Sequence, residues 1–317
     1  MHSKPFRMPD DIPPSLRALI ELFCSDALRV RCVAGETINA EILYLIRFFR
    51  HFGLPDSCDE LVRVVSPASI SAFLVEYAES NSSGSVRWMQ VSLRSFLRFA
   101  YRSALFDRDF SALVPVRSIR RLASVPRSLP DECIARLRSG IARSSPAGLR
   151  DSAIICLLAV YGVRGVQIRR LRLDDIDWRN ERIHFPAAKG GRPIEQHLMP
   201  EAGNLLSGYI RSARPRSEHS EIFLTLREPF CPLPSATYLS DTVKRHIKRL
   251  GLVLPDGVSP GTHGFRHAFA SRMVGKVPFK DLIDQLGHRD PASTLIYSKV
   301  DLDGLRQTAL PWPGGEQ

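Results

Sequence analysis

The sequence contains no long apolar run. Its longest one, residues 153–163, is 11 residues long, whereas a helix that crosses a bilayer needs about 20. The first 20 residues hold two aspartates and four prolines, without the apolar segment of a secretory signal peptide. These shortages argue against a secreted or membrane-spanning protein, and we expect a cytoplasmic protein with no membrane partner.

Cysteine is scarce and scattered. The chain has 6 cysteines in 317 residues, and no two of them form a C-x-x-C pair. Disulfide scaffolds and cysteine-based zinc sites need more regular and closer spacing. We therefore expect reduced, mostly buried thiols, with no disulfide framework and no metal site.

Lysine and the acidic residues are in short supply relative to arginine. The chain has 44 Lys and Arg against 33 Asp and Glu, a net charge of +11, and 37 of the 44 basic residues are arginine. This charge favours a polyanionic partner, most often nucleic acid, and arginine is the better phosphate ligand because its guanidinium donates two parallel hydrogen bonds. A GC-rich genome would also enrich arginine, so composition alone leaves both explanations open.

Length and uneven charge both suggest two domains. A chain of 317 residues exceeds the usual size of one domain, and 44% hydrophobic residues are enough to form real cores. The first 80 residues carry a net charge of −3, whereas residues 81–127 carry +7. Residues 114–130 contain three prolines and four arginines with little periodicity, which is typical of a linker. We expect a first domain at 1–113, a linker at 114–130 and a second domain at 131–317.

Three helices are predicted before residue 110. Residues 37–52 have apolar side chains at helical spacing, and Gly53 follows as a stop. Ser66 is a typical N-cap for a helix that begins at Pro67 and runs to about Ser80. Residues 83–105 form a longer helix with one continuous apolar face.

The helix at 83–105 also carries four arginines within an arc of roughly 80°. A guanidinium stripe fixed beside a packed face is suited to DNA phosphates, although a solvated basic face would look the same. Two of the four linker arginines are further candidates. The candidate DNA-binding residues are Arg87, Arg94, Arg98, Arg102, Arg120 and Arg121.

Residues beyond the linker predict a mainly α fold with a small β-sheet. Strands are expected at 182–185 and 196–199, on either side of a hairpin tip that contains Lys189. Helices are expected at 131–143, 149–161, 201–212, 235–250, 263–274 and 279–286.

Four segments of this second half carry residues suited to phosphate chemistry. Each alone has an ordinary structural explanation, such as a surface pair on a helix or a core tyrosine. They are Gly162-Val163-Arg164, the hairpin Lys189, Thr262-His263-Gly264-Phe265-Arg266-His267, and Leu286-Gly287-His288 with Tyr297 nine residues after the histidine.

In this order and spacing, the segments resemble the motifs of the tyrosine recombinases, also called the phage integrase family. The resemblance covers about 127–310, and residues 36–110 are similar to the helical core-binding domain that precedes the catalytic domain in this family. It implies an all-helical, SAM-like N-terminal core-binding domain followed by a mixed α/β catalytic domain. It also implies DNA cleavage through a covalent 3′-phosphotyrosyl intermediate, without a metal or nucleotide cofactor.

The resemblance makes Tyr297 the nucleophile and Arg164 and Arg266 the phosphate-binding arginines. This assignment suits the chemistry, because two guanidiniums stabilise the charge that builds up on the non-bridging oxygens and stay protonated at any working pH. Tyrosine is a weak nucleophile at its ordinary pKa near 10, so it needs a base or an electropositive pocket.

The remaining pocket residues of the family match His263, His288 and Lys189. We expect His263 to accept the tyrosine proton and His288 to bond a phosphate oxygen. Lys189 would protonate the 5′-oxygen that leaves, although Arg192 is a rival for this role. Many family members have an acidic residue where this chain has Gln167, whose amide can still orient Arg164 by hydrogen bonds.

Strand exchange through a Holliday junction would require a homotetramer on double-stranded DNA at a specific recombination site. We expect a mobile-element enzyme, with possible accessory DNA-bending or directionality proteins. The apolar tail at 301–317 could dock on a neighbouring protomer or pack on its own domain. The competing functions are a type IB topoisomerase-like enzyme that relaxes DNA and a catalytically inactive DNA-binding regulator.

Overall fold

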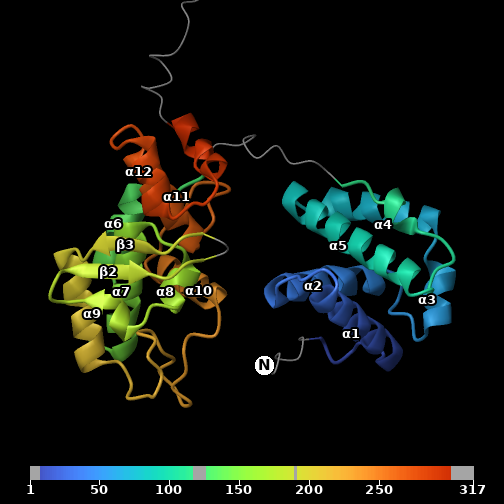
Figure 1. The fold of residues 1–317 in the computed structure, drawn as a ribbon, viewed down its shortest axis with the longest axis horizontal. Coiled ribbons are helices and arrows are strands. Elements are labelled where there is room, and N and C mark those ends of the chain that lie inside the picture. The colour runs from blue at the N-terminus through green and yellow to red at the C-terminus, as the bar shows by residue number, and fades with distance from the viewer. Residues whose placement is uncertain (1–7, 117–125, 189–190, 301–317) are drawn as a thin grey trace, which may run out of the picture. The chain divides into compact units, whose positions relative to one another are not determined.

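The computed structural model describes residues 8–116, 126–188 and 191–300. The chain divides into two compact units, Met1–Arg120 and Arg121–Gln317, which are described separately (Figure 1). The candidate residues Lys189, Arg120 and Arg121 and the tail at 301–317 lie outside the described residues.

The described part of the first unit is built from helices (Figure 1). The helices are α1 (Pro14–Arg29), α2 (Gly35–His51), α3 (Cys58–Val64), α4 (Pro67–Ser80), α5 (Ser83–Arg102) and a 3₁₀ turn at Phe110–Leu113.

Serine side chains set the starts of three of these helices. Ser57 and Ser82 each accept a hydrogen bond from the backbone N–H three residues later, which satisfies one of the free donors of a helix start. Ser66 does the same for Ser69, whose hydroxyl in turn accepts from the Ser66 backbone N–H. The predicted start of α4 at Pro67 is confirmed.

The apolar face of α5 packs into the core of the first unit. Phe96 is fully buried and meets Phe23 and Phe49 edge to face, with ring centroids 5.9 and 5.3 Å apart. The helix ends at Arg102 and not at residue 105, because Ala104 adopts a positive φ of 55°. Burial of this face fixes the rotation of α5 and therefore the direction of its arginines.

The sequence analysis did not predict α1 and α3. In α1 the buried Leu16, Ile20, Phe23 and Ala27 are three or four residues apart, so the helical pattern was present, and Pro14 occupies the first turn where proline is tolerated. α3 has only 7 residues, which is too short for periodicity to identify.

The second unit combines helices with a small sheet (Figure 1). Its helices are α6 (Asp131–Ser139), α7 (Pro146–Tyr161), α8 (Gly165–Arg169), α9 (Pro200–Ser212), α10 (Ala236–Arg249), α11 (Thr262–Met273) and α12 (Phe279–Leu286). Short 3₁₀ turns lie at Leu173–Asp175, Pro291–Ser293 and Leu295–Val300. Its strands are β1 (Ile176–Asp177), β2 (Arg182–Phe185) and β3 (Ile194–His197).

The three strands are antiparallel in the order β1-β2-β3. Phe185 is opposite Ile194 and Arg182 is opposite His197, so β3 is two residues earlier in the chain than predicted. The strand β1 was not predicted. Ile183 and Phe185 point into the core while the side chains between them are exposed, as expected for a sheet with one buried face.

Helix α7 forms the centre of the second unit and packs against α6, α9 and α11. It is buried nearly all round, which explains its apolar sequence. The predicted mainly α fold with a small sheet is confirmed. Among the described residues, no single helix is long and apolar enough to cross a membrane; α3 and α4 reach that length and apolarity only as a pair bent by 77°.

Candidate active site

The site begins where α7 ends. Gly162 closes this helix with a left-handed φ of 58°, and a β-carbon there would lie 2.5 Å from the ring of Phe269 on α11. Glycine is therefore required both by the turn and by the close approach of α11. The turn brings Arg164 to the N-terminus of α8.

Gln167 fixes the backbone at Arg164. Its side-chain oxygen accepts the Arg164 backbone N–H at 3.0 Å, and its side-chain amide donates to the carbonyl of Pro186 at 3.0 Å. The neutral amide thus connects α8 to the end of β2 with one acceptor and one donor, whereas a carboxylate could supply only acceptors. The structure accommodates this departure from the family pattern.

Arg266 is the centre of a buried network between α7, α11 and α12. It is 5% exposed, and its guanidinium donates to the carbonyl of Gly162 at 2.9 Å and to the carbonyl of Leu286 at 2.7 Å. A third bond, at 2.7 Å, runs from its Nη2 to Nε2 of His288. Burial and the nearby Arg164 lower the pKa of Arg266 to about 9, which leaves it charged at neutral pH.

His288 supports Arg266 as a neutral imidazole. Because Nε2 accepts from Arg266, the ring proton is on Nδ1, which donates to Oγ1 of the buried Thr294 at 2.6 Å. Burial and the charges of Arg266 and Arg164 lower the pKa of His288 to about 4. In this arrangement the ring has no N–H left for a phosphate oxygen, which differs from the role predicted for it.

Tyr297 lies in the 3₁₀ turn at Leu295–Val300 and is 3% exposed. Burial raises the pKa of its phenol, and the charges of Arg266 and Arg164 oppose this shift, so the hydroxyl lies within electrostatic reach of both arginines. Its hydroxyl is 2.9 Å from Nδ1 of His267.

His267 was not among the predicted site residues. It follows Arg266 directly, and its adjacency to the motif arginine was the only signal in the sequence. The predicted proton acceptor, His263, lies one turn earlier on α11 and is exposed. The structure therefore joins Arg266 and His288 by a hydrogen bond and places Arg164 with His288 on one pocket. Tyr297 is bonded to His267, and the charges of both arginines act on its phenol.

An open pocket of about 500 Å³ lies beside this network. It is lined by Arg164, His288, Gly191 and Gly287 together with Arg289, Asp290 and Ser293. Gly191 follows the Lys189 position of the hairpin, which lies outside the described residues. Among the residues described, no group of His, Cys, Asp and Glu could hold a metal ion.

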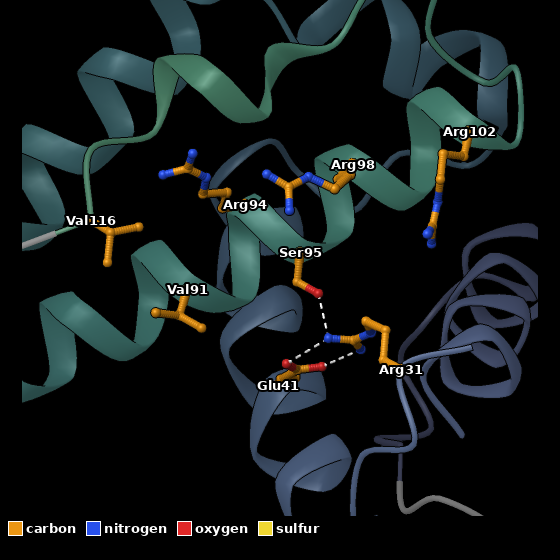
Figure 2. Close-up of a pocket in the computed structure, with 8 residues that line it drawn as sticks. All are labelled: Arg31, Glu41, Val91, Arg94, Ser95, Arg98, Arg102 and Val116. Carbon is orange, nitrogen blue, oxygen red and sulfur yellow. Dashed lines mark hydrogen bonds and ion pairs between the residues drawn. The ribbon is translucent and has the colours of Figure 1, made fainter. Parts of the chain in front are cut away.

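The first unit carries a second basic feature, on α5. Arg94, Arg98 and Arg102 line one pocket of about 370 Å³ (Figure 2). Arg87 is exposed and does not line this pocket. Arg31 also lines this pocket and forms two hydrogen bonds with the buried Glu41. Residue type and spacing do not single out Arg31, because its contact with Glu41 depends on how α1, α2 and α5 pack.

Comparison with known proteins agrees with this geometry. The phage integrase family pattern matches residues 128–303. The protein named "Putative integrase/recombinase y4rA" of Sinorhizobium fredii (strain NBRC 101917 / NGR234) is 35% identical over 311 residues, which cover 97% of this chain and 74% of that protein. The tyrosine recombinase XerD of Ralstonia nicotianae (strain ATCC BAA-1114 / GMI1000) is 25% identical over 301 residues, 93% of this chain and 94% of XerD.

Solved structures share the fold. A lambda integrase tetramer bound to a Holliday junction matches with a TM-score of 0.66 at 20% identity, over 90% of this chain and 78% of that one. The XerH site-specific recombinase in a post-cleavage complex with its difH substrate matches with a TM-score of 0.65 at 18% identity, over 91% and 83%. From the family match over more than half of its length and its 35% identity to y4rA, this chain belongs to the phage integrase family, the tyrosine recombinases.

Proposed function

We propose that this recombinase cuts and rejoins duplex DNA at a specific site through a 3′-phosphotyrosyl bond to Tyr297. The observation that carries the proposal is that Arg266 is bonded to His288, which lines one pocket with Arg164, while the charges of both arginines act on the buried phenol of Tyr297. A buried tyrosine beside two arginines is costly to maintain unless an anion is to be bound there.

Each group has a role in phosphoryl transfer. Arg164 and Arg266 would hold the two non-bridging oxygens of the scissile phosphate and neutralise the charge that develops in the transition state. His288 would orient Arg266 through the bond at 2.7 Å. Because Arg266 already donates to the carbonyls of Gly162 and Leu286, its position is set before DNA binds.

The leaving 5′-oxygen needs a proton, and we assign its transfer to Lys189, as the family resemblance implies. A lysine ammonium is a compact donor whose proton is lost more readily than that of a guanidinium. Arg192 is exposed and lies near the other end of the same hairpin, so it remains the rival donor. The role of His263 as proton acceptor stays a prediction.

The arginines of α5 would bind the DNA backbone. Arg94 and Arg98 project from α5 into the same pocket (Figure 2). Arg102 forms an ion pair with Asp26 at 2.7 Å. The buried face of α5 prevents the helix from turning these side chains away. Arg87, Arg120 and Arg121 remain candidates on sequence grounds.

Complete recombination would proceed through a Holliday junction within a homotetramer on double-stranded DNA. The fold shared with the lambda integrase tetramer on a Holliday junction supports this assembly. The similarity to y4rA and to the Tn1549 transposon integrase supports a mobile-element origin. Such an enzyme would act in the cytoplasm, where accessory DNA-bending or directionality proteins could assist it.

The test is covalent capture on a nicked suicide substrate that traps the cleaved strand. The parental protein should form a DNA adduct that survives denaturant, and Tyr297→Phe should form none while still binding DNA. Tyr101→Phe, which changes an exposed tyrosine of the first unit, is the matched control and should form the adduct normally. An adduct with Tyr297→Phe would refute the assignment.

A second readout separates the competing functions. Recombination between two target sites on one plasmid is expected of a recombinase, whereas relaxation of supercoils without exchange would indicate a topoisomerase-like enzyme. DNA binding without any adduct in the parental protein would indicate an inactive regulator.

A further inference from the structure

A second pocket of the second unit lies away from the candidate active site. It has a volume of about 580 Å³ and is lined by the start of α7, the loop at 225–227 and one face of α10. Its buried member Arg150 is on the same helix as Gly162, but about 18 Å from it at 1.5 Å per residue. The proposed function uses no residue of this pocket.

Arg150 is held in a fixed position in the lining of this pocket. It is 3% exposed, and its Nε and Nη2 donate to Oδ1 of Asp151 at 3.1 and 3.0 Å. Its Nη1 donates to the carbonyl of Leu224 at 3.2 Å, and its Cζ lies 5.5 Å from the ring centroid of Tyr238. These contacts fix a buried positive charge in advance, as a preorganised binding site requires.

Asp151 is the one acid among the described residues of the lining, and its carboxylate is fully engaged. Oδ1 accepts both bonds from Arg150, and Oδ2 accepts from Nη2 of Arg245 at 3.1 Å and from Nε2 of His246 at 2.9 Å. Burial opposes ionisation, but the hydrogen bond from His246 and the charge of Arg150 lower the pKa of Asp151, so it is charged at neutral pH. The four acceptor sites of the carboxylate are therefore all used within the protein.

The lining of the pocket carries an excess of positive charge. Against the carboxylate of Asp151 it has four arginines, which are Arg150, Arg227, Arg245 and Arg249. Arg227 and Arg249 are exposed, and no hydrogen bond or ion pair within the described part of the chain engages either guanidinium. A concave surface lined by charge of one sign focuses its field and attracts counter-ions.

We propose that this pocket binds a phosphate group, with Arg227 and Arg249 as ligands and with Arg150 and Arg245 fixed beside them by Asp151. A guanidinium can donate two parallel hydrogen bonds to phosphate oxygens, which makes arginine the better ligand for this anion. The volume is within the ordinary range of small-ligand sites. The first turn of α7 also lines the pocket, so the positive end of that helix adds to the attraction.

Phosphate groups reach a recombinase in two forms, as small phosphorylated molecules and as the DNA backbone. A small anion would bind to this pocket in the absence of DNA and would stabilise the folded protein. A backbone phosphate would instead add to the other DNA contacts, and its loss would change the salt dependence of DNA binding. The experiment therefore has two arms.

The first arm measures thermal unfolding in inorganic phosphate without DNA. At about ten times the dissociation constant, phosphate should raise the Tm of the parental protein by about 3–6 °C relative to sodium chloride of equal ionic strength. Arg227→Gln/Arg249→Gln should lose most of this rise. Arg179→Gln/Arg211→Gln, which removes two exposed charges of the same unit outside the pocket, is the matched control and should keep the rise.

Phosphate that binds at the candidate active site does not confuse this comparison. Arg164 and Arg266 are unchanged in both double variants, so a difference between the variants belongs to the second pocket. Both variants should keep the parental circular dichroism spectrum, because Arg227 and Arg249 are exposed and the control residues are exposed as well.

The second arm measures binding of duplex DNA across a range of salt concentrations. If Arg227 and Arg249 each meet a backbone phosphate, their double variant should reduce the slope of log K against log salt by about 1.8, since each contact contributes about 0.9. The Arg179→Gln/Arg211→Gln control should keep the parental slope.

The two arms identify the source of the phosphate. A rise in Tm that only the pocket variant loses supports a small phosphorylated molecule, and a reduced salt slope without such a rise supports the DNA backbone. If the pocket variant and the control behave alike in both arms, the inference is overturned and the arginines are a solvated surface. Neither arm depends on the Tyr297 adduct, so this failure is distinct from failure of the proposed function.

Discussion

Replacing Thr294 with valine tests whether neutral His288 holds Arg266 in position. Thr294 is fully buried, and its hydroxyl accepts the Nδ1–H of His288 at 2.6 Å. Valine has nearly the same shape but no acceptor, so Nδ1–H would be left without a partner. Moving the proton to Nε2 would not help, because that atom faces a donor, Nη2 of Arg266.

The loss of stability and of cleavage rate in Thr294→Val follows from this geometry. A buried donor without a partner costs about 1–3 kcal/mol, which for a domain of about 200 residues lowers Tm by roughly 2–12 °C. A hydrogen bond to a charged group contributes about 1.5–3 kcal/mol, so poorer orientation of Arg266 should slow cleavage roughly 10- to 100-fold.

The assays are thermal unfolding followed by circular dichroism and single-turnover cleavage of the suicide substrate. Thr294→Ser keeps the hydroxyl and should retain most of the stability and rate. Parental Tm and cleavage in Thr294→Val would refute the reasoning, because His288 would then hold Arg266 without a fixed tautomer.

The neutrality of His288 has a measurable pH consequence. Its pKa is lowered to about 4 in the folded protein, against an ordinary value near 6.5 in the unfolded chain. Between these values the unfolded chain binds more protons, so the contribution to stability is present above about pH 6.5 and is lost as the pH falls toward 4. Denaturant unfolding at pH 7 and pH 5 should show a smaller acid loss for His288→Ala than for the parental protein; equal losses would contradict this.

Three further outcomes are expected. Lys189→Ala should lose roughly 10²–10⁴ in cleavage rate, and a substrate with a sulfur 5′-leaving atom, which needs no proton, should restore most of that rate. If this substrate rescues Arg192→Ala and not Lys189→Ala, the proton donor is Arg192. Arg98→Ala should reduce the slope of log K against log salt by about 1 with unchanged sequence preference, whereas Arg63→Ala on α3 should keep the parental slope. Deleting residues 302–317 should spare suicide-substrate cleavage but reduce recombination if the tail docks on a neighbour; equal loss of both would favour packing on its own domain.

Local signals in the sequence predicted the elements that carry the site. Ser66-Pro67 has the two residues of a helix start, and α11 and α12 begin within one residue of their predicted positions. Boundaries that depend on a single backbone angle were missed, such as the end of α5, where Ala104 turns to a positive φ. Nothing in residue type at position 104 indicates this conformation, because alanine is a good helix former.

The residue types that the site needs could be predicted from the sequence, but the contacts between them could not. Residue types and spacing identified Arg164, Arg266 and Tyr297, because phosphoryl transfer requires cations and a nucleophile. They did not indicate that His267 would form a hydrogen bond with Tyr297. That contact depends on where the turn at Leu295–Val300 packs, which is decided by contacts between distant segments.

Gly162 and Gly287 belong to the sequence motifs and also shape the contacts of the site. Gly287 ends α12 with a φ of 60°, and a β-carbon there would lie 2.8 Å from the side chain of Ile194 on β3. Gly162 likewise ends α7 against α11, and its carbonyl accepts from Arg266. Both glycines allow a helix end to approach a neighbouring element so closely that backbone carbonyls become ligands of the arginine. A side chain at either position would separate these elements, so the glycines of the two motifs belong to the arginine site as much as the charged residues beside them.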